Sequence, residues 1–141
     1  MIDDLYQKDL LRLAANATGA GRLESPDASV TVDNPLCGDR VTIDLDLADG
    51  KISAVAHDVK GCVLCQASVS VLGAHAVGET AQGLRAVQEA VRGMLEGSGG
   101  LDGQWDELGS FLPVAAHKSR HNCVLLPFQA VIEAADKAAG G

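Results

Sequence analysis

Apolar and polar residues alternate strictly from Val41 to Leu47, a pattern that is typical of a β-strand with one buried face. Asp49-Gly50 then supplies a two-residue hairpin turn, and the residues from Lys51 to His57 are predicted to form the return strand. A shorter alternating run, from Ser29 to Val32, predicts another strand before the hairpin. The pattern therefore predicts a small β-sheet in the first half of the chain.

The hairpin turn predicts which residues of the two strands face each other. With Asp49-Gly50 as the loop, Leu47 faces Ile52 and Ile43 faces Ala56, so that one face of the hairpin is apolar. The same pairing turns His57 outward. It also brings the chain that enters the hairpin and the chain that leaves it to one end of the sheet.

Four stretches carry the spacing of amphipathic or buried helices. Thr80 is predicted to cap one of them, and Pro127 is predicted to fit within the first turn of the last helix. The predicted helices cover residues 3–17, residues 62–78, a stretch after Thr80, and a last helix that begins at Cys123.

Length and charge exclude several classes of protein. A chain of 141 residues is expected to form a single domain, residues 1–141, with one hydrophobic core. The net charge of −8 argues against binding to nucleic acid, because phosphate contacts need clustered Lys and Arg. No stretch reaches the roughly 20 apolar residues of a membrane span. The acidic start, Met1-Ile2-Asp3-Asp4, is unlike a signal peptide, so we expect a cytoplasmic protein with reduced thiols.

Three of the four cysteines occupy positions that are unusual for core residues. Cys37 and Asp39 share a loop just before the predicted hairpin, Cys62 follows Gly61 at a predicted helix start, and Cys123 is predicted to open the last helix. A helix N-terminus lowers the pKa of a thiol and favours the thiolate that binds metals. We therefore expect Cys37, Asp39, Cys62 and Cys123 to converge on one metal or sulfur-handling site.

Three further residues leave alternatives open. Cys65 is interpreted as a small buried residue, although Cys62 and Cys65 also have the spacing of a thiol redox pair. His121 is interpreted as a surface histidine, with a metal ligand or a proton shuttle as the alternatives. Arg120 could stabilise a thiolate or persulfide, or simply be solvated.

These motifs resemble a known family. Asn34-Pro35-Leu36-Cys37-Gly38-Asp39, a hairpin, Gly61-Cys62 followed by Ala67-Ser68, and a single cysteine before the last helix are similar to the NifU N-terminal/IscU/SufU scaffolds of iron–sulfur cluster assembly. The resemblance implies an α+β fold, with a three-stranded antiparallel sheet covered by about four to five helices. It also implies that Cys37, Asp39, Cys62 and Cys123 bind iron, a transient Fe–S cluster or Zn²⁺.

Two features resemble the SufU branch of the family in particular. Asn122 stands where IscU-type members have histidine, and Arg120 matches an arginine three residues before the last cysteine. By this resemblance, Cys37 accepts sulfur from a SufS-like cysteine desulfurase and Arg120 stabilises the thiolate or persulfide. The sulfur or cluster would then pass to a downstream Fe–S scaffold or an apo-protein.

The sequence thus supports three hypotheses. The first is a scaffold and sulfur acceptor in iron–sulfur cluster assembly, either non-enzymatic or acting as a zinc-dependent sulfurtransferase. The second is a structural zinc-binding interaction module. The third is a thiol redox protein that uses Cys62 and Cys65.

Overall fold

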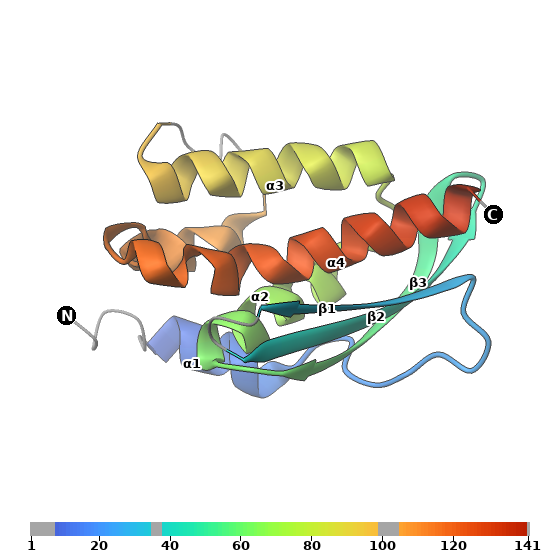
Figure 1. Cartoon of the computed structure of the whole chain (residues 1–141), viewed down its shortest axis with the longest axis horizontal. Helices are drawn as coiled ribbons and strands as arrows, with labels where there is room; N and C mark the ends of the chain where they lie inside the picture. Colours follow the sequence, from blue (N-terminus) through green and yellow to red (C-terminus); the bar gives the residue numbers. More distant parts are fainter. Residues whose placement is uncertain (1–7, 35–37, 99–104, 141) are drawn as a thin grey trace.

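The computed structural model describes residues 8–34, 38–98 and 105–140 and confirms the α+β fold (Figure 1). One antiparallel sheet, with strand order β1-β2-β3, is covered by helices. The elements, in chain order, are α1 (Lys8–Asn16), β1 (Ala28–Asn34), β2 (Asp39–Ala48), β3 (Lys51–Lys60), α2 (Val63–His75), α3 (Ala81–Glu96), the 3₁₀ segments η2 (Asp106–Ala116) and η3 (Lys118–Arg120), and α4 (His121–Gly140).

The hairpin between β2 and β3 forms at the predicted turn. Asp49 and Gly50 both have left-handed backbone angles, with φ of 55° and 78°, as a tight turn of this type requires. The predicted pairing of Leu47 with Ile52 is confirmed. Beyond it, a β-bulge between Asp46 and Leu47 shifts the register by one residue, so that Ile43 faces His57 and the predicted pairing of Ile43 with Ala56 is wrong.

The bulge also reverses the prediction for His57. A shift of one residue moves a strand side chain to the other face of the sheet, and His57 is 3% exposed instead of facing outward. Its Nε2 donates a hydrogen bond to the Thr18 carbonyl oxygen at 2.7 Å. Burial lowers the pKa of His57, which favours the neutral ring.

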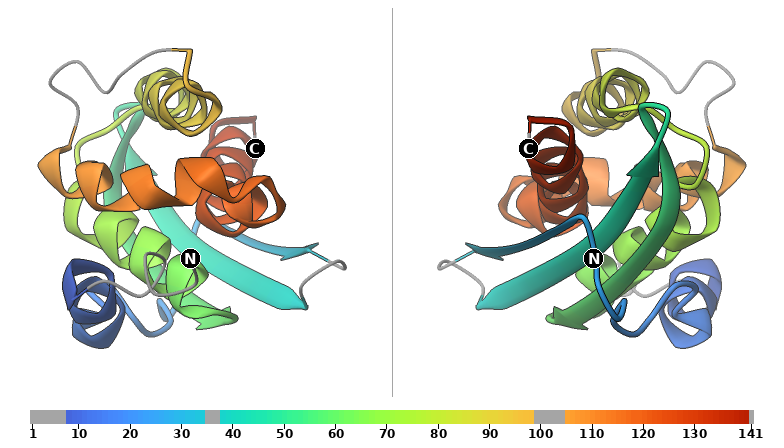
Figure 2. Two further views of the ribbon diagram at one scale, coloured as in Figure 1. Left: turned by 90° about the vertical axis from the view of Figure 1, so that its left-hand side faces the viewer. Right: turned by 90° about the vertical axis from the view of Figure 1, so that its right-hand side faces the viewer.

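The helices stack on one side of the sheet. α4 lies over β1 and β2, α2 lies beside β3, and α1 packs against α2 (Figure 1). The end-on views show α3 on the far side of α4 from the sheet (Figure 2), in contact with α4 and η2. Val41, Ile43 and Leu45 of β2 are buried beneath these helices. Within the described segments, the helices are too short or too polar to cross a membrane.

The helix ends agree with the sequence signals in part: the predicted start of the first helix lies outside the described residues, and α2 ends at His75, before the predicted end at residue 78. Thr80 caps α3 as predicted, since its side chain accepts a hydrogen bond from the Gly83 N–H at 3.0 Å. α4 begins at His121 instead of Cys123. Pro127 is therefore its seventh residue and lies in the helix interior, so the prediction of a first-turn proline is wrong.

Gly73 allows α2 to approach the chain that follows α1. A Cβ atom at this position would lie 1.8 Å from the Thr18 carbonyl oxygen, a backbone atom that cannot rotate away as the end of a flexible side chain could. We expect Gly73→Ala to lower the free energy of unfolding by about 3 kcal/mol or more, because the overlap outweighs the better helix propensity of alanine. Urea-induced unfolding measures this loss.

Gly109→Ala is the matched control for that substitution, because a Cβ atom at Gly109 would meet no atom within 4 Å. We expect its free energy of unfolding to stay within about 0.5 kcal/mol of wild type. Equal stability of the Gly73→Ala and wild-type proteins would show that α2 does not approach the chain after α1 this closely.

Candidate metal centre

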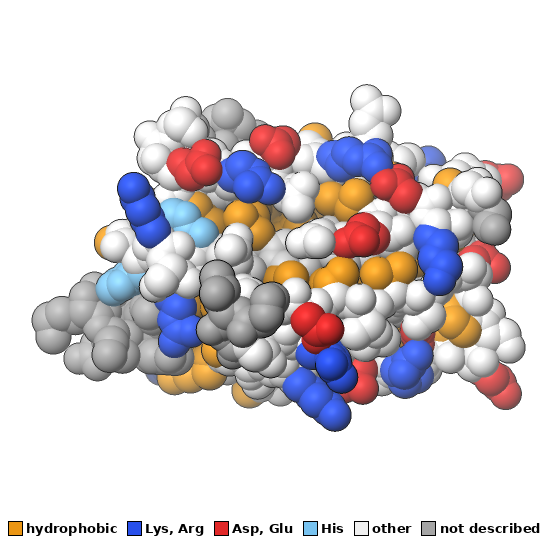
Figure 3. Space-filling model, viewed as in Figure 1, with side chains coloured by type: hydrophobic (Ala, Val, Ile, Leu, Met, Phe, Trp, Pro, Cys, Tyr) orange, Lys and Arg blue, Asp and Glu red, His pale blue; other side chains and the backbone are white. Residues whose placement is uncertain are grey.

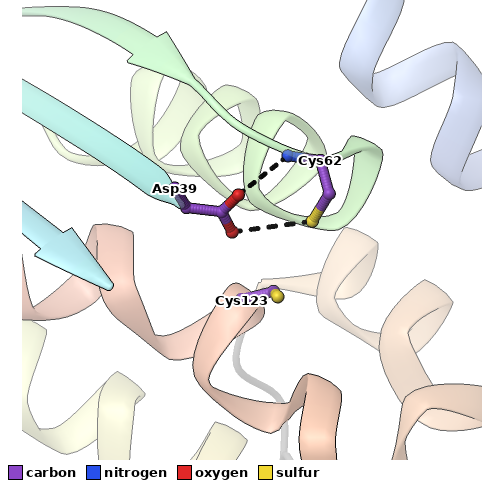
Figure 4. A group of neighbouring side chains, drawn as sticks. All are labelled: Asp39, Cys62 and Cys123. Carbon is purple, nitrogen blue, oxygen red and sulfur yellow. Dashed lines mark hydrogen bonds between the residues drawn. The ribbon is translucent and has the colours of Figure 1, made fainter. Parts of the chain in front are cut away.

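Three of the four predicted site residues come together at one end of the sheet. Asp39 is the first residue of β2, Cys62 lies between β3 and α2, and Cys123 is in the first turn of α4 (Figure 4). One donor atom from each lies within 4.8 Å of the other two. Cys37, the remaining predicted residue, lies outside the described residues.

The hairpin explains why Asp39 and Cys62 are neighbours. Arg40 pairs with Lys60 at the end of the β2–β3 ladder, so the residues just before and just after this pair leave the sheet together. The prediction that the two ends of the hairpin meet is therefore confirmed. Cys123 reaches the same place from α4, because α4 lies over the sheet and contacts α2.

The Asp39 carboxylate is held tightly in this arrangement. It is 2% exposed, and its Oδ1 accepts a hydrogen bond from the Cys62 N–H at 3.1 Å. Its Oδ2 accepts a weaker hydrogen bond from the Cys62 thiol at 3.6 Å (Figure 4). Gly61 leaves room for the carboxylate, since a Cβ atom there would lie 2.7 Å from Oδ1. The only sequence signal for this role of Gly61 is its place directly before Cys62.

The surroundings of Cys62 favour its thiolate. The neighbouring Cys123 thiol is the main cause that lowers the pKa of Cys62 to about 7, and the N–H groups of Cys65 and Leu64 at the start of α2 add to it. Burial and the charge of Asp39 act in the opposite direction. The N–H groups at the helix start thus contribute to the lower pKa of Cys62, as expected, but the Cys123 thiol is the larger cause.

Cys123 is completely buried and contacts a basic side chain. The Arg120 guanidinium donates from Nη1 to the Cys123 sulfur at 3.9 Å. Arg120 therefore lies where it can stabilise a negative charge on this sulfur, in agreement with the first of its two sequence interpretations.

The segment before Cys123 is basic in an otherwise acidic chain. His117, Lys118, Arg120 and His121 lie within five residues, and no Asp or Glu occurs between Glu107 and Glu133. Lysine, arginine and histidine side chains are visible at the end of the molecule where α4 begins (Figure 3). This end of the molecule can therefore attract an anionic group or an acidic protein surface.

The donor set suits a thiophilic metal. A tetrahedral zinc site with Zn–S bonds of about 2.3 Å places its sulfurs about 3.8 Å apart. The donor atoms of Asp39, Cys62 and Cys123 lie within 4.8 Å of one another, so their separations need to shorten by only about 1 Å to reach that geometry. Two sulfurs and a carboxylate leave one position for a further ligand.

The remaining candidate residues have other contacts. Cys65 is 0% exposed within the core, which agrees with its interpretation as a small buried residue. His121 donates from Nε2 to the Ala115 carbonyl oxygen at 3.1 Å. His75 hydrogen-bonds Glu107 at 2.9 Å and stacks on Trp105, with 4.9 Å between the ring centroids. These contacts place none of the three in the group formed by Asp39, Cys62 and Cys123.

Comparisons with known proteins identify relatives of the chain. Residues 5–110 match the family described as NifU-like N terminal domain. The iron-sulfur cluster assembly scaffold protein IscU of Thermotoga maritima is 24% identical over 133 residues, which are 94% of each chain. The scaffold protein IscU 1 of Archaeoglobus fulgidus is 33% identical over 101 residues, which are 71% of this chain and 64% of that protein.

Two solved structures share the fold. The N-terminal part of a NifU-like protein from Brucella abortus superposes with a TM-score of 0.91 and 40% identity, over 99% of this chain and 97% of that one. A putative scaffold protein for the SUF system from Fervidobacterium islandicum superposes with a TM-score of 0.86 over 93% and 96% of the two chains. At 24% identity, the second likeness concerns the fold alone.

Proposed function

The chain belongs to the NifU-like N-terminal domain family, and from that premise we propose that it is an iron–sulfur cluster assembly scaffold that accepts sulfur from a cysteine desulfurase. The observation that carries the proposal is the convergence of Asp39, Cys62 and Cys123 from three distant parts of one domain. Cys37 is the fourth ligand in this proposal. It precedes Asp39 by two residues, so the chain itself limits its distance from the site.

The proposed sulfur transfer is a thiol–disulfide-type exchange. The Cys37 thiolate attacks the terminal sulfur of the desulfurase persulfide, a new S–S bond forms on Cys37, and the desulfurase cysteine leaves as a thiolate. No electrons are gained or lost overall, and the Cys37 proton goes to solvent beforehand. Arg120 stabilises the thiolate of Cys123 while the ligands around the site rearrange.

A donor set of three cysteines and one aspartate suits a metal cluster that is later transferred to another protein. Three cysteine sulfurs bind iron or zinc strongly, whereas the carboxylate of Asp39 is a harder and weaker ligand for a cluster. Electron-transfer clusters are usually held by four cysteines, so the aspartate favours assembly and release over permanent binding. Zn²⁺ also fits these four residues, as expected for a SufU-like sulfurtransferase.

Anaerobic reconstitution tests the proposal. The purified chain is incubated with a cysteine desulfurase, L-cysteine, Fe²⁺ and dithiothreitol, which reduces the transferred sulfur to sulfide, and is then mixed with an apo-ferredoxin while visible absorption is recorded. A parallel sample without Fe²⁺ and dithiothreitol is analysed for bound metal and persulfide. We expect a coloured protein whose cluster moves to the apo-ferredoxin, or a zinc-loaded protein that carries a persulfide. A chain that acquires neither sulfur nor a cluster would contradict the proposal.

Metal removal distinguishes this scaffold from a structural zinc module. The site lies at one end of the sheet, and the hydrogen bonds between Asp39 and Cys62 form without a metal ion. We expect the metal-free protein to keep its helical circular dichroism and a cooperative thermal transition. Unfolding at 25 °C on chelation would instead favour a structural site, because such domains fold only with their metal.

A further inference from the structure

A buried hydrogen bond connects the two helices that carry Cys62 and Cys123. The Ser68 hydroxyl, on α2, donates to the Val124 carbonyl oxygen, on α4, at 2.7 Å. Both residues are 0% exposed. Because no water reaches this bond, a lost partner cannot be replaced by solvent without a change in the packing of α2 against α4.

The two ends of this bond lie close to the site in the chain. Cys62 is the N-cap of α2, less than two turns before Ser68, and Val124 follows Cys123 directly. Only a short stretch of backbone thus separates each end of the bond from its cysteine. The separation between Ser68 and Val124 therefore controls the separation between the two cysteines.

α4 has a particular need for such support at its start. Pro127 lies in the helix interior, where it has no N–H to donate and where its ring presses on the carbonyl group four residues earlier. That carbonyl belongs to residue 123. The first turns of α4 are thus less firmly fixed by the helix itself, and the hydrogen bond from α2 holds them in place.

We propose that Ser68 is a positioning residue that sets the distance between the Cys62 and Cys123 sulfurs and thereby the metal affinity of the site. This inference rests on the proposed function, since it assumes that the two sulfurs bind one metal. Ser68 does not touch the metal. Its effect reaches the site through Val124 and the backbone of Cys123.

Ser70 offers a matched control on the same helix. It is also buried, at 2% exposed, and its Oγ accepts one hydrogen bond from the backbone N–H of Thr18 at 3.1 Å. That bond joins α2 to the chain after α1 and not to α4. Ser70→Ala therefore removes the hydroxyl of a buried α2 serine, and with it a hydrogen bond that does not involve α4.

Cobalt binding is the test, because Co²⁺ takes up zinc-like sites and its thiolate charge-transfer absorption reports on bound cysteines. We expect Ser68→Ala to weaken Co²⁺ binding by about tenfold or more and to reduce the charge-transfer band, as for other residues that orient metal ligands. Ser70→Ala should bind Co²⁺ within about twofold of wild type, because its bond lies away from the site. Both variants should lose a similar few degrees of melting temperature.

A third variant separates the hydroxyl from stability. Ser68→Thr keeps the hydroxyl and adds a methyl group in a packed region, so we expect a lower melting temperature with nearly wild-type Co²⁺ affinity. Equal Co²⁺ affinities of Ser68→Ala and Ser70→Ala would overturn the role of Ser68. Failure of the wild-type protein to bind Co²⁺ through thiolates would overturn the proposed site itself, and this inference with it.

Discussion

Replacement of Cys37 by serine is expected to abolish sulfur transfer from a cysteine desulfurase to this chain. A serine hydroxyl stays protonated at neutral pH and cannot attack the persulfide, so the rate of transfer should fall by at least about 100-fold, a modest figure for the loss of a nucleophile. The measurement is the release of sulfide from the desulfurase–scaffold mixture after reduction, together with the mass of the acceptor chain, which gains one sulfur atom.

Cys65→Ala is the control for this substitution. Cys65 is completely buried in the core, so its removal should leave the rate of sulfur transfer unchanged. If Cys37→Ser accepts sulfur as fast as wild type, Cys37 is not the acceptor. Cys123, whose sulfur contacts Arg120, would then be the next candidate. Peptide mapping of the persulfide identifies which cysteine carries it.

The hairpin shows how far local sequence signals determine this site. Alternation in β2 and the Asp49-Gly50 turn suffice to predict that the chain around Asp39 meets the chain around Cys62. The turn chemistry is local, and two strands joined by a two-residue loop have only one pairing near the turn. This part of the site could therefore be predicted without knowledge of the tertiary fold.

Farther from the turn, the pairing depends on a feature without a local signal. The β-bulge at Asp46/Leu47 has no glycine beside it on either strand, and it reverses the face on which His57 lies. The burial of Asp44 could not be predicted either. Asp44 alternates with apolar residues and shares its face of β2 with Thr42 and Asp46, yet it is 1% exposed. Arg22 and Ser29, which both come from segments outside the hairpin, bind its carboxylate at 2.6 Å.

The position of Cys123 depends on long-range packing. The sequence indicates a helix near this residue but not its start at His121, because Pro127 suggests a later beginning. What brings Cys123 to Cys62 is the packing of α4 on α2 and the sheet, which is decided by many buried aliphatic contacts. No single motif encodes that packing. The place of Cys123 at a predicted helix start leads to the expectation that it joins the site, and the family resemblance supports the same expectation independently.

Loss of the Cys123 sulfur is expected to have the second large effect, this time on metal binding. Serine at this position would be a neutral, poorly coordinating hydroxyl, so the affinity for Zn²⁺ should fall by at least about 100-fold, more than for a residue that only orients a ligand. Competition with a chromophoric chelator measures this affinity. The same variant should fail to hold a cluster after anaerobic reconstitution.

Folding has to be separated from ligation in this experiment, because Cys123 is 0% exposed and a buried hydroxyl costs about 1–3 kcal/mol. Cys123→Ala avoids that cost and should lose Zn²⁺ to the same extent while it keeps a cooperative thermal transition. Cys65→Ala removes an equally buried sulfur from the same core and should bind Zn²⁺ like wild type. If Cys123→Ala retained wild-type affinity, the metal would be bound by Asp39 and Cys62 with other partners, and the convergence of α4 on the site would have a structural role only.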